Sequence, residues 1–228
     1  MILALNTAQT VHELALLQED QKELRLLKEQ RWPDDHQDVE TLVPRLQNLL
    51  DETGLRKEEI QAVLVVKGPG SFTSLRTGVA FANALVEGLS DSRSQRVQLY
   101  EWSTFECLAH KAATQPVLVL LPAGGADVGL YFEGELKVGP LSELLAVHPH
   151  GAELKIVAEL PETLEDELHS IILEKKWKRV QGHELQTLGE SLQSLGLPQI
   201  QPVEQVNALY LKGPKITLSS DRWKQVRT

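Results

Sequence analysis

The sequence predicts an α/β protein of two lobes, each built on a mixed sheet flanked by helices. Three observations support this. Strand-like apolar runs fill much of the first 30 residues, continuous apolar runs recur at Ala62–Val66 and Val117–Leu121, and segments with apolar residues at helical spacing lie between them. An opening order of three strands, helix, strand and helix, followed by a second α/β half, indicates two ribonuclease-H-like halves.

The first half contains four predicted strands and two predicted helices. The strands are Met1–Leu5, Val11–Leu17, Glu23–Leu27 and Ile60–Val66, and the helices cover 39–54 and Thr73–Gly88. The leucines of the third strand would also suit a helix. Pro44 lies inside the first helical pattern, so we expect the regular helix to start near that residue.

A polar segment, Asp91–Arg96, marks the predicted boundary between an N-terminal lobe of residues 1–96 and a C-terminal lobe of residues 97–228. Beyond it the α/β alternation resumes. The predicted strands are Val97–Tyr100, Val117–Leu121, Gly129–Glu133, Glu135–Val138, Leu154–Val157 and Arg179–Gln181, and the predicted helices are Ser103–Ala113, Leu141–Val147, Glu162–His169 and Glu184–Leu195.

The composition excludes several classes of protein. Cys107 is the one cysteine among 228 residues, so neither an intramolecular disulfide nor a cysteine-based zinc site can form. The net charge of −9 argues against nucleic-acid binding that extends over the whole surface. No apolar run approaches the ~20 residues that span a bilayer, and the N-terminus lacks the basic segment of a signal peptide. We therefore expect a cytoplasmic protein without membrane contact.

The most specific motif is the glycine-rich turn Gly68-Pro69-Gly70-Ser71-Phe72-Thr73, which joins a buried strand to a helix. Its glycines permit positive φ and close backbone approach. Thr73 is placed to cap the helix, and the free N–H groups at the helix start can hold an anion. The lysine precedes the glycines and no Gly-x-Ser-x-Gly frame surrounds Ser71, so this is neither a P-loop nor a nucleophile elbow. Two interpretations stay open, a structural turn and a ligand or partner loop.

The helix after this turn has two faces. One gathers the apolar residues expected in the core, namely Leu75, Val79, Ala82, Leu85, Val86 and Leu89. The opposite face carries Arg76, Ala80, Asn83, Ala84 and Glu87. Its small residues would let a partner helix approach closely, although alanine also simply favours helix formation.

Other polar residues give weaker signals. None of the seven histidines is paired at a spacing of three or four residues, so the sequence predicts no helical metal site, and we assign no catalytic residue. The C-terminal stretch Gln205–Thr228 has a local charge of +4. It can contact nucleic-acid phosphates or an acidic partner, or it can be a solvated tail. Its basic residues are Lys212, Lys215, Arg222, Lys224 and Arg227.

The stretch Gly68–Gly78 resembles the Gly-Pro-Gly-Ser-Phe-Thr-Gly-Leu-Arg-x-Gly motif of the TsaB (YeaZ) family. Three further segments match that family in order. Ile2–Ala8 is similar to its opening, Leu42-Val43-Pro44 to a Leu-Leu-Pro in its first helix, and Ala208–Lys212 to its late Pro-x-Tyr-Leu-Arg element. The markers span nearly the whole chain.

This resemblance implies an actin-like (ASKHA) fold and a part in making threonylcarbamoyladenosine on the tRNA adenosine beside the anticodon. In that family the protein is a catalytically inert paralogue of TsaD, the subunit that transfers the threonylcarbamoyl group, and the ATPase TsaE completes the complex. The family's interface helices map onto Val39–Thr53 and Thr73–Gly88, and the same surface can form a homodimer. The resemblance implies no intrinsic cofactor, ATP or ADP only at the partner interface, and tRNA contact only through the complex.

Several positions depart from the family's pattern. Asn6 stands where aspartate is usual, Ser74 replaces the motif's glycine, and Asp38 aligns with the family's histidine, with His36 two residues earlier. The turn at Asn6 occupies the place where actin-like ATPases bind phosphate and magnesium, and an amide cannot supply the anionic ligand that hard cations prefer. The sequence therefore favours a non-catalytic scaffold over an actin-like ATPase or kinase, and over a metallopeptidase, which needs metal-ligating histidines.

Overall fold

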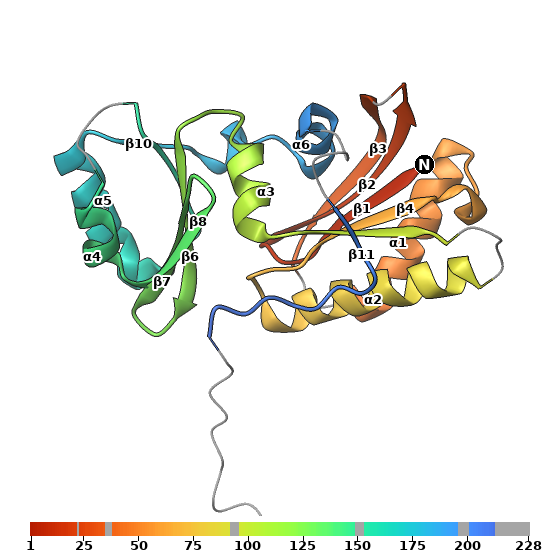
Figure 1. Cartoon of the computed structure of the whole chain (residues 1–228), viewed down its shortest axis with the longest axis horizontal. Helices are drawn as coiled ribbons and strands as arrows, with labels where there is room; N and C mark the ends of the chain where they lie inside the picture. Colours follow the sequence, from red (N-terminus) through yellow and green to blue (C-terminus); the bar gives the residue numbers. More distant parts are fainter. Residues whose placement is uncertain (22, 35–37, 92–95, 149–152, 196–200, 213–228) are drawn as a thin grey trace, which may run out of the picture.

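A computed structural model of the chain describes residues 1–21, 23–34, 38–91, 96–148, 153–195 and 201–212. These residues form two sheets that lie one after the other along the longest axis of the molecule (Figure 1). The larger sheet has the strand order β11-β5-β4-β1-β2-β3, and the smaller one β10-β9-β6-β7-β8. None of the described helices combines the length and apolar character that a membrane span requires.

The larger sheet combines antiparallel and parallel pairing. β1 (Ile2–Asn6), β2 (Val11–Asp20) and β3 (Glu23–Pro33) are antiparallel neighbours. β4 (Ala62–Val66) and β5 (Gln98–Trp102) run parallel to β1, and β11 (Pro202–Val203) pairs antiparallel with β5. β1 and β4 are buried along their whole length, because helices cover both faces of the sheet.

Three helices provide that cover. α1 (Asp38–Thr53) and α2 (Phe72–Ser90) pack on one face, and α6 (Leu188–Leu195) packs on the other (Figure 1). Five of the six α2 residues assigned to the core face are buried as predicted, while Leu85 is half-buried. Leucine and valine side chains at helical spacing thus meet a sheet that is apolar on both sides.

The smaller sheet forms the second lobe. Its strands are β6 (Val117–Gly124), β7 (Asp127–Phe132), β8 (Glu135–Pro140), β9 (Lys155–Ala158) and β10 (Lys178–Arg179). α4 (Leu141–Ala146) and α5 (Glu162–Lys175) pack together beside it. α3 (Thr104–Lys111) contacts both β6 and α6, so it lies where the two lobes meet (Figure 1).

Most predicted elements are confirmed, with shifts at their ends. The segment that follows β2 is a strand, not a helix, because it pairs with β2 from end to end. The prediction that the first helix starts near Pro44 is wrong: α1 begins at Asp38. Pro44 removes the bond to the carbonyl of Glu40, but both residues are exposed, so water can serve that carbonyl. The last predicted helix, Glu184–Leu195, is shorter than predicted: α6 begins at Leu188, and the 3-10 turn η2 (Gly182–Glu184) precedes it. Another 3-10 turn, η1 (Lys57–Glu59), precedes β4.

The lobes do not divide the chain at one point. The sequence places the boundary between residues 96 and 97, but β5, α6 and β11 follow that point and belong to the larger sheet or its cover. A parallel neighbour of β4 must come after a crossover, and α2 supplies it, so β5 returns to the first lobe. The chain then crosses to the smaller sheet and comes back at α6.

The glycines of the motif are required by close packing against the turn after β1. A Cβ atom at Gly70 would lie 1.9 Å from the carbonyl oxygen of Ala8, and one at Gly78 would lie 2.1 Å from Oγ1 of Thr7. Gly68 has φ +103°, a conformation that favours glycine. This close packing is what the structural interpretation of the turn requires, and it leaves a ligand or partner role open.

We expect Gly70→Ala to destabilise the fold by about 2–4 kcal/mol, because the new methyl group meets backbone rather than a movable side chain. Gly88→Ala, in the helix α2 that follows Gly70, is the control. No atom lies within 4 Å of its Cβ position, so it should stabilise by about 0.5–1 kcal/mol. Urea unfolding of both variants checks this, and equal free energies of unfolding would contradict it.

Candidate functional site

The motif loop, residues 68–73, and the residues on either side of it are hydrogen-bonded to three other parts of the chain. The Ser71 N–H donates to the carbonyl of Ala8 at 3.1 Å, and the Thr7 hydroxyl donates to the carbonyl of Ser74 at 2.8 Å. The Thr104 N–H at the start of α3 donates to the carbonyl of Gly68 at 2.8 Å. Just before the loop, the carbonyl of Lys67 accepts from the N–H of Leu209, in the C-terminal segment, at 2.7 Å. The loop thereby fixes where α2 begins.

The helix start differs from the prediction. α2 begins at Phe72 with Ser71 as its N-cap residue, and no side-chain capping bond forms there. Thr73 lies in the first turn, where its carbonyl accepts from the Thr77 hydroxyl at 3.1 Å. The ring of Phe72 is 48% exposed and packs against Tyr210, with ring centroids 5.3 Å apart. The loop thus presents an aromatic pair at the surface.

A cleft of about 1040 Å³ separates the two lobes beside this loop. The first lobe contributes the turn after β1, Asp34 and the motif loop. The second lobe contributes the end of β6, the segment after β9, and Arg179. The wall includes the polar residues Gln9, Glu159, Glu165 and Lys212. This position between two lobes is the usual place for a ligand site.

A buried carboxylate lies behind the cleft. Glu13 on β2 is fully buried, and its Oε2 accepts from Lys111 Nζ at 2.7 Å and from Asn6 Nδ2 at 3.1 Å. Its Oε1 accepts from the Leu188 N–H at 3.1 Å, and Arg31 Nε lies 3.6 Å away. One charge thus connects β1, β2, α3 and the start of α6.

The turn after β1 is occupied by its own hydrogen bonds. Asn6 is buried and donates to Gln9 Oε1 at 2.8 Å as well as to Glu13, while its Oδ1 accepts from the Ala8 N–H at 3.1 Å. Gln9 then donates across the cleft to Glu159 Oε1 at 2.6 Å. The side chain at the place of the family's usual aspartate therefore holds the turn together.

The pKa values of Glu159 and Glu165, which line the cleft on the side of the second lobe, are shifted in opposite directions. Burial raises the pKa of Glu159 above its ordinary 4.5, although the Gln9 bond opposes the shift. The hydrogen bonds from Arg179, at 2.5 and 2.9 Å, lower the pKa of Glu165. The charged form of Glu159 is therefore disfavoured in the folded protein, whereas that of Glu165 is favoured.

We expect Glu159→Gln to raise the melting temperature at pH 7, since glutamine keeps an acceptor for Gln9 without the buried charge. Because the folded pKa of Glu159 is raised, this gain should vanish below pH 4.5 and grow as the pH rises through the folded pKa. Glu165→Gln is the control of opposite sign, because it should lower the melting temperature. This decrease should be complete above pH 4.5 and should shrink as the pH falls through the lowered pKa of Glu165 in the folded protein. Melting scans from pH 3 to 8 measure both, and parallel curves would contradict this.

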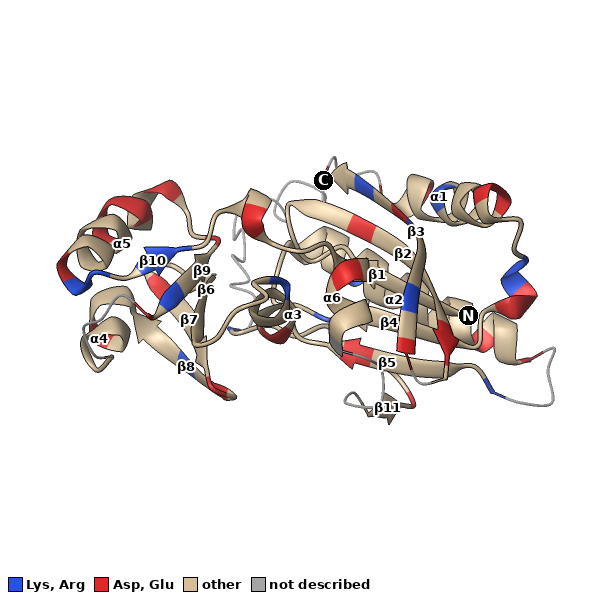
Figure 2. Cartoon of the chain, turned by 90° about the horizontal axis from the view of Figure 1, so that it is seen from above, with Lys and Arg blue, Asp and Glu red and all other residues tan. Residues whose placement is uncertain are grey.

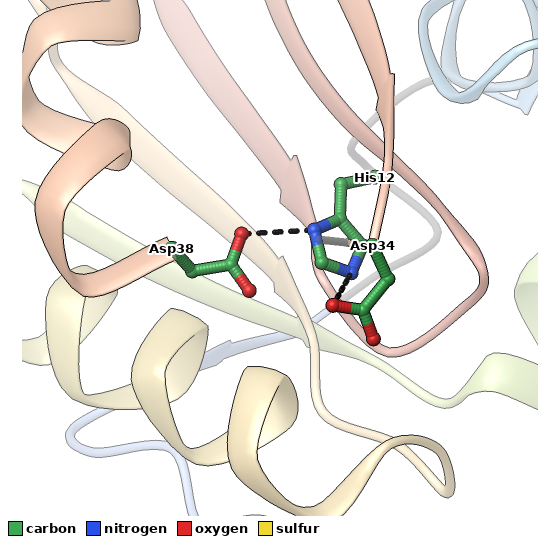
Figure 3. Close-up of side chains that lie close together, drawn as sticks. All are labelled: His12, Asp34 and Asp38. Atoms are coloured by element: carbon green, nitrogen blue, oxygen red, sulfur yellow. Dashed lines mark hydrogen bonds and ion pairs between the residues drawn. The ribbon is translucent and has the colours of Figure 1, made fainter. Parts of the chain in front are cut away.

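A second polar cluster joins β2, the end of β3 and α1. His12 Nδ1 lies 2.9 Å from Asp38 Oδ1, and His12 Nε2 lies 3.8 Å from Asp34 Oδ1 (Figure 3). His12 is fully buried and Asp38 is 2% exposed, while Asp34 lines the cleft. Among the described residues these three could hold a metal ion.

Sequence reasoning missed this cluster, because it searched for histidines at helical spacing. A signal was present in β2, where the two polar residues His12 and Glu13 begin an otherwise apolar run. Both side chains of such a pair are buried only when both faces of the strand are covered. Polar neighbours in a doubly covered strand are the pattern to search for.

The predicted interface residues lie mainly on the outer face of α2. Arg76, Ala80, Ala84 and Glu87 follow one another at spacings of four, four and three and are all exposed. Asn83 is half-buried. Its side-chain nitrogen donates to the carbonyl of Val206 at 2.9 Å, and its side-chain oxygen accepts from the Val206 N–H at 3.0 Å. Asn83 therefore anchors the C-terminal segment to the helix.

Exposed apolar residues also lie on the neighbouring helix α1 and at the start of α2. Val39 and Val43 on α1 are 76% and 62% exposed, and the guanidinium carbon of Arg76 lies 5.2 Å from the Phe72 ring centroid. Val39 and Val43 are one helical turn apart, so they share a side of α1. We call Val39, Val43, Phe72, Arg76, Ala80 and Ala84 the α1–α2 surface.

The basic C-terminal stretch is described only in part. Lys212 forms an ion pair with Asp127 on β7. The other four basic residues, Lys215, Arg222, Lys224 and Arg227, lie outside the described residues, as do His36 and His150. In the view of Figure 2, the lysines and arginines of the described part are scattered over both lobes among acidic residues.

Comparison with known proteins gives a family model and similar folds. The model for TsaD, tRNA N6-adenosine threonylcarbamoyltransferase, matches residues 34–142, which include the motif loop and α2. The structure is similar to an uncharacterized Pseudomonas aeruginosa protein with similarity to peptidase YeaZ, with a TM-score of 0.68 and 22% identity over 92% of this chain and 99% of that one. YeaZ from the same organism gives 0.64 and 21% over 92% and 98%.

The chain has the fold of the YeaZ proteins. The predicted two-lobed α/β architecture is thereby confirmed, and so is the resemblance to YeaZ proteins that the motif predicts. The match extends over nearly all of both YeaZ-type structures, so the second lobe shares the likeness as well as the motif.

Proposed function

We propose that this chain is a non-catalytic subunit of the system that makes threonylcarbamoyladenosine on tRNA, and that it binds and supports a TsaD-like subunit. The observation that carries the proposal is the motif loop with α2, whose packing reproduces what the YeaZ-like motif requires and whose outer face is exposed. The match to the TsaD model over the same region and the YeaZ fold support it.

The α1–α2 surface is the proposed binding face. It offers exposed valines on one helix and small residues on the next, so that partner helices can approach closely. We propose that a TsaD-like subunit or a second copy of this chain occupies it, with a TsaE-like ATPase completing the complex. ATP or ADP would then bind at the partner interface rather than to this chain alone.

One feature supports a role without catalysis. The turn where actin-like ATPases hold phosphate carries Asn6, and both the nitrogen and the oxygen of its side-chain amide are hydrogen-bonded inside the protein. Contact with tRNA would be indirect, because the net charge is −9 and Figure 2 shows the basic residues of the described part of the chain scattered rather than gathered.

We expect Ala80→Arg to abolish or weaken by at least about tenfold the binding of TsaD from the same organism, since a long charged side chain would enter the centre of the surface. Ala146→Arg, at an exposed end of α4 in the other lobe, is the matched control and should bind as wild type does. Co-purification and titration calorimetry measure this. Failure of wild type to bind, or equal binding by both variants, would contradict the interface.

The alternative is an actin-like ATPase or kinase that acts alone, which the interlobe cleft of about 1040 Å³ favours. We expect the purified chain to hydrolyse ATP with magnesium no faster than buffer. Turnover that is lost on Thr7→Ala, while Ala146→Arg retains it, would establish the ATPase and remove the proposal of a non-catalytic role.

A further inference from the structure

The cluster of His12, Asp34 and Asp38 has a geometry that hydrogen bonding alone does not satisfy (Figure 3). Asp38 Oδ1 lies 2.9 Å from Nδ1 of the imidazole, a normal hydrogen-bond distance. On the other side of the ring, 3.8 Å separates Nε2 from Asp34 Oδ1, which is too long for a hydrogen bond. Among the described residues, the buried Nε2 atom has no hydrogen-bond partner.

We propose that a divalent cation of the zinc type binds between His12 Nε2 and the carboxylate of Asp34. Zinc bonds of about 2.0–2.1 Å at tetrahedral angles place two ligand atoms roughly 3.3 Å apart, so a shift of about half an ångström would accommodate the ion. An imidazole nitrogen beside a carboxylate oxygen suits zinc, whereas magnesium prefers oxygen ligands in an octahedron.

The surroundings hold both ligands in place. Asp38 accepts the Nδ1–H of His12, which leaves Nε2 with its lone pair toward Asp34, and such carboxylate–histidine pairs are the usual support of a metal-bound imidazole. The Ser74 hydroxyl donates to Asp34 Oδ1 at 3.1 Å. The edge of Trp32 covers the imidazole ring, with ring centroids 5.7 Å apart, so the site is closed on that side.

The open side is the cleft. Asp34 is part of the cleft wall, so water can fill the remaining coordination positions and the ion can enter from solvent. The cation would join β2 and the end of β3 directly. Through Asp38 and Ser74 it would also fix the first residue of α1 and the first turn of α2. This cation site does not depend on the proposed function, because all of its residues belong to this chain.

The test is a zinc titration of the untagged full-length chain after removal of metal with a chelator. We expect one equivalent of Zn²⁺ bound to wild type with a rise in melting temperature, and no comparable binding of Mg²⁺. Asp34→Asn keeps an acceptor for Ser74 but loses the charged ligand, so zinc affinity should fall at least about tenfold. Glu165→Gln removes another carboxylate of the same cleft and should bind as wild type does.

A second variant tests the supporting carboxylate. Asp38→Asn should lower zinc affinity about 10- to 100-fold, as loss of such a support commonly does. Circular dichroism shows whether Asp38→Asn folds. If Asp38→Asn does not fold, the zinc affinity of Asp34→Asn alone tests the site. Absence of zinc binding by wild type would overturn the proposal. Equal binding by wild type and Asp34→Asn would also overturn it, and the bound zinc would then belong to other histidines.

Discussion

The buried carboxylate of Glu13 is the interaction on which the arrangement of the two lobes depends. A charge without solvent is tolerated only when donors surround it, and Glu13 receives them from β1, α3 and the start of α6. Lys111 ends the helix that contacts both lobes, and Leu188 begins the helix that covers the larger sheet. The return of the chain to the first lobe at α6 thus has a specific electrostatic anchor.

The motif acts through contact distances rather than through reactive groups. Gly70 and Gly78 let α2 and its preceding loop lie directly on the turn at Thr7 and Ala8. Because that turn also lines the cleft, the same packing sets both the cleft wall and the orientation of the exposed face of α2. A loop of this kind connects the interior of the first lobe with a surface that a partner can reach.

The polar groups at one side of the cleft are bonded to one another. Asn6, Gln9 and Glu159 form a chain of hydrogen bonds from the buried sheet to the second lobe, and these polar groups satisfy one another. Asp34 lies in the wall of the same cleft, and its Oδ1 is 3.8 Å from Nε2 of the buried His12.

The sequence by itself determined the order of elements, the two halves, and the motif that leads to the YeaZ fold, because apolar periodicity and glycine-rich turns are local properties of the chain. It also determined which side of α2 faces the core, since Leu75 and Val79 follow the period of a helix. Only the tertiary structure decided that Asn83 anchors the C-terminal segment, that α6 and β11 return to the first sheet, and that His12 meets Asp34 and Asp38. The physical reason is that these contacts join residues distant in sequence or on different elements, and no local pattern records which side chains such pairing brings within hydrogen-bond distance.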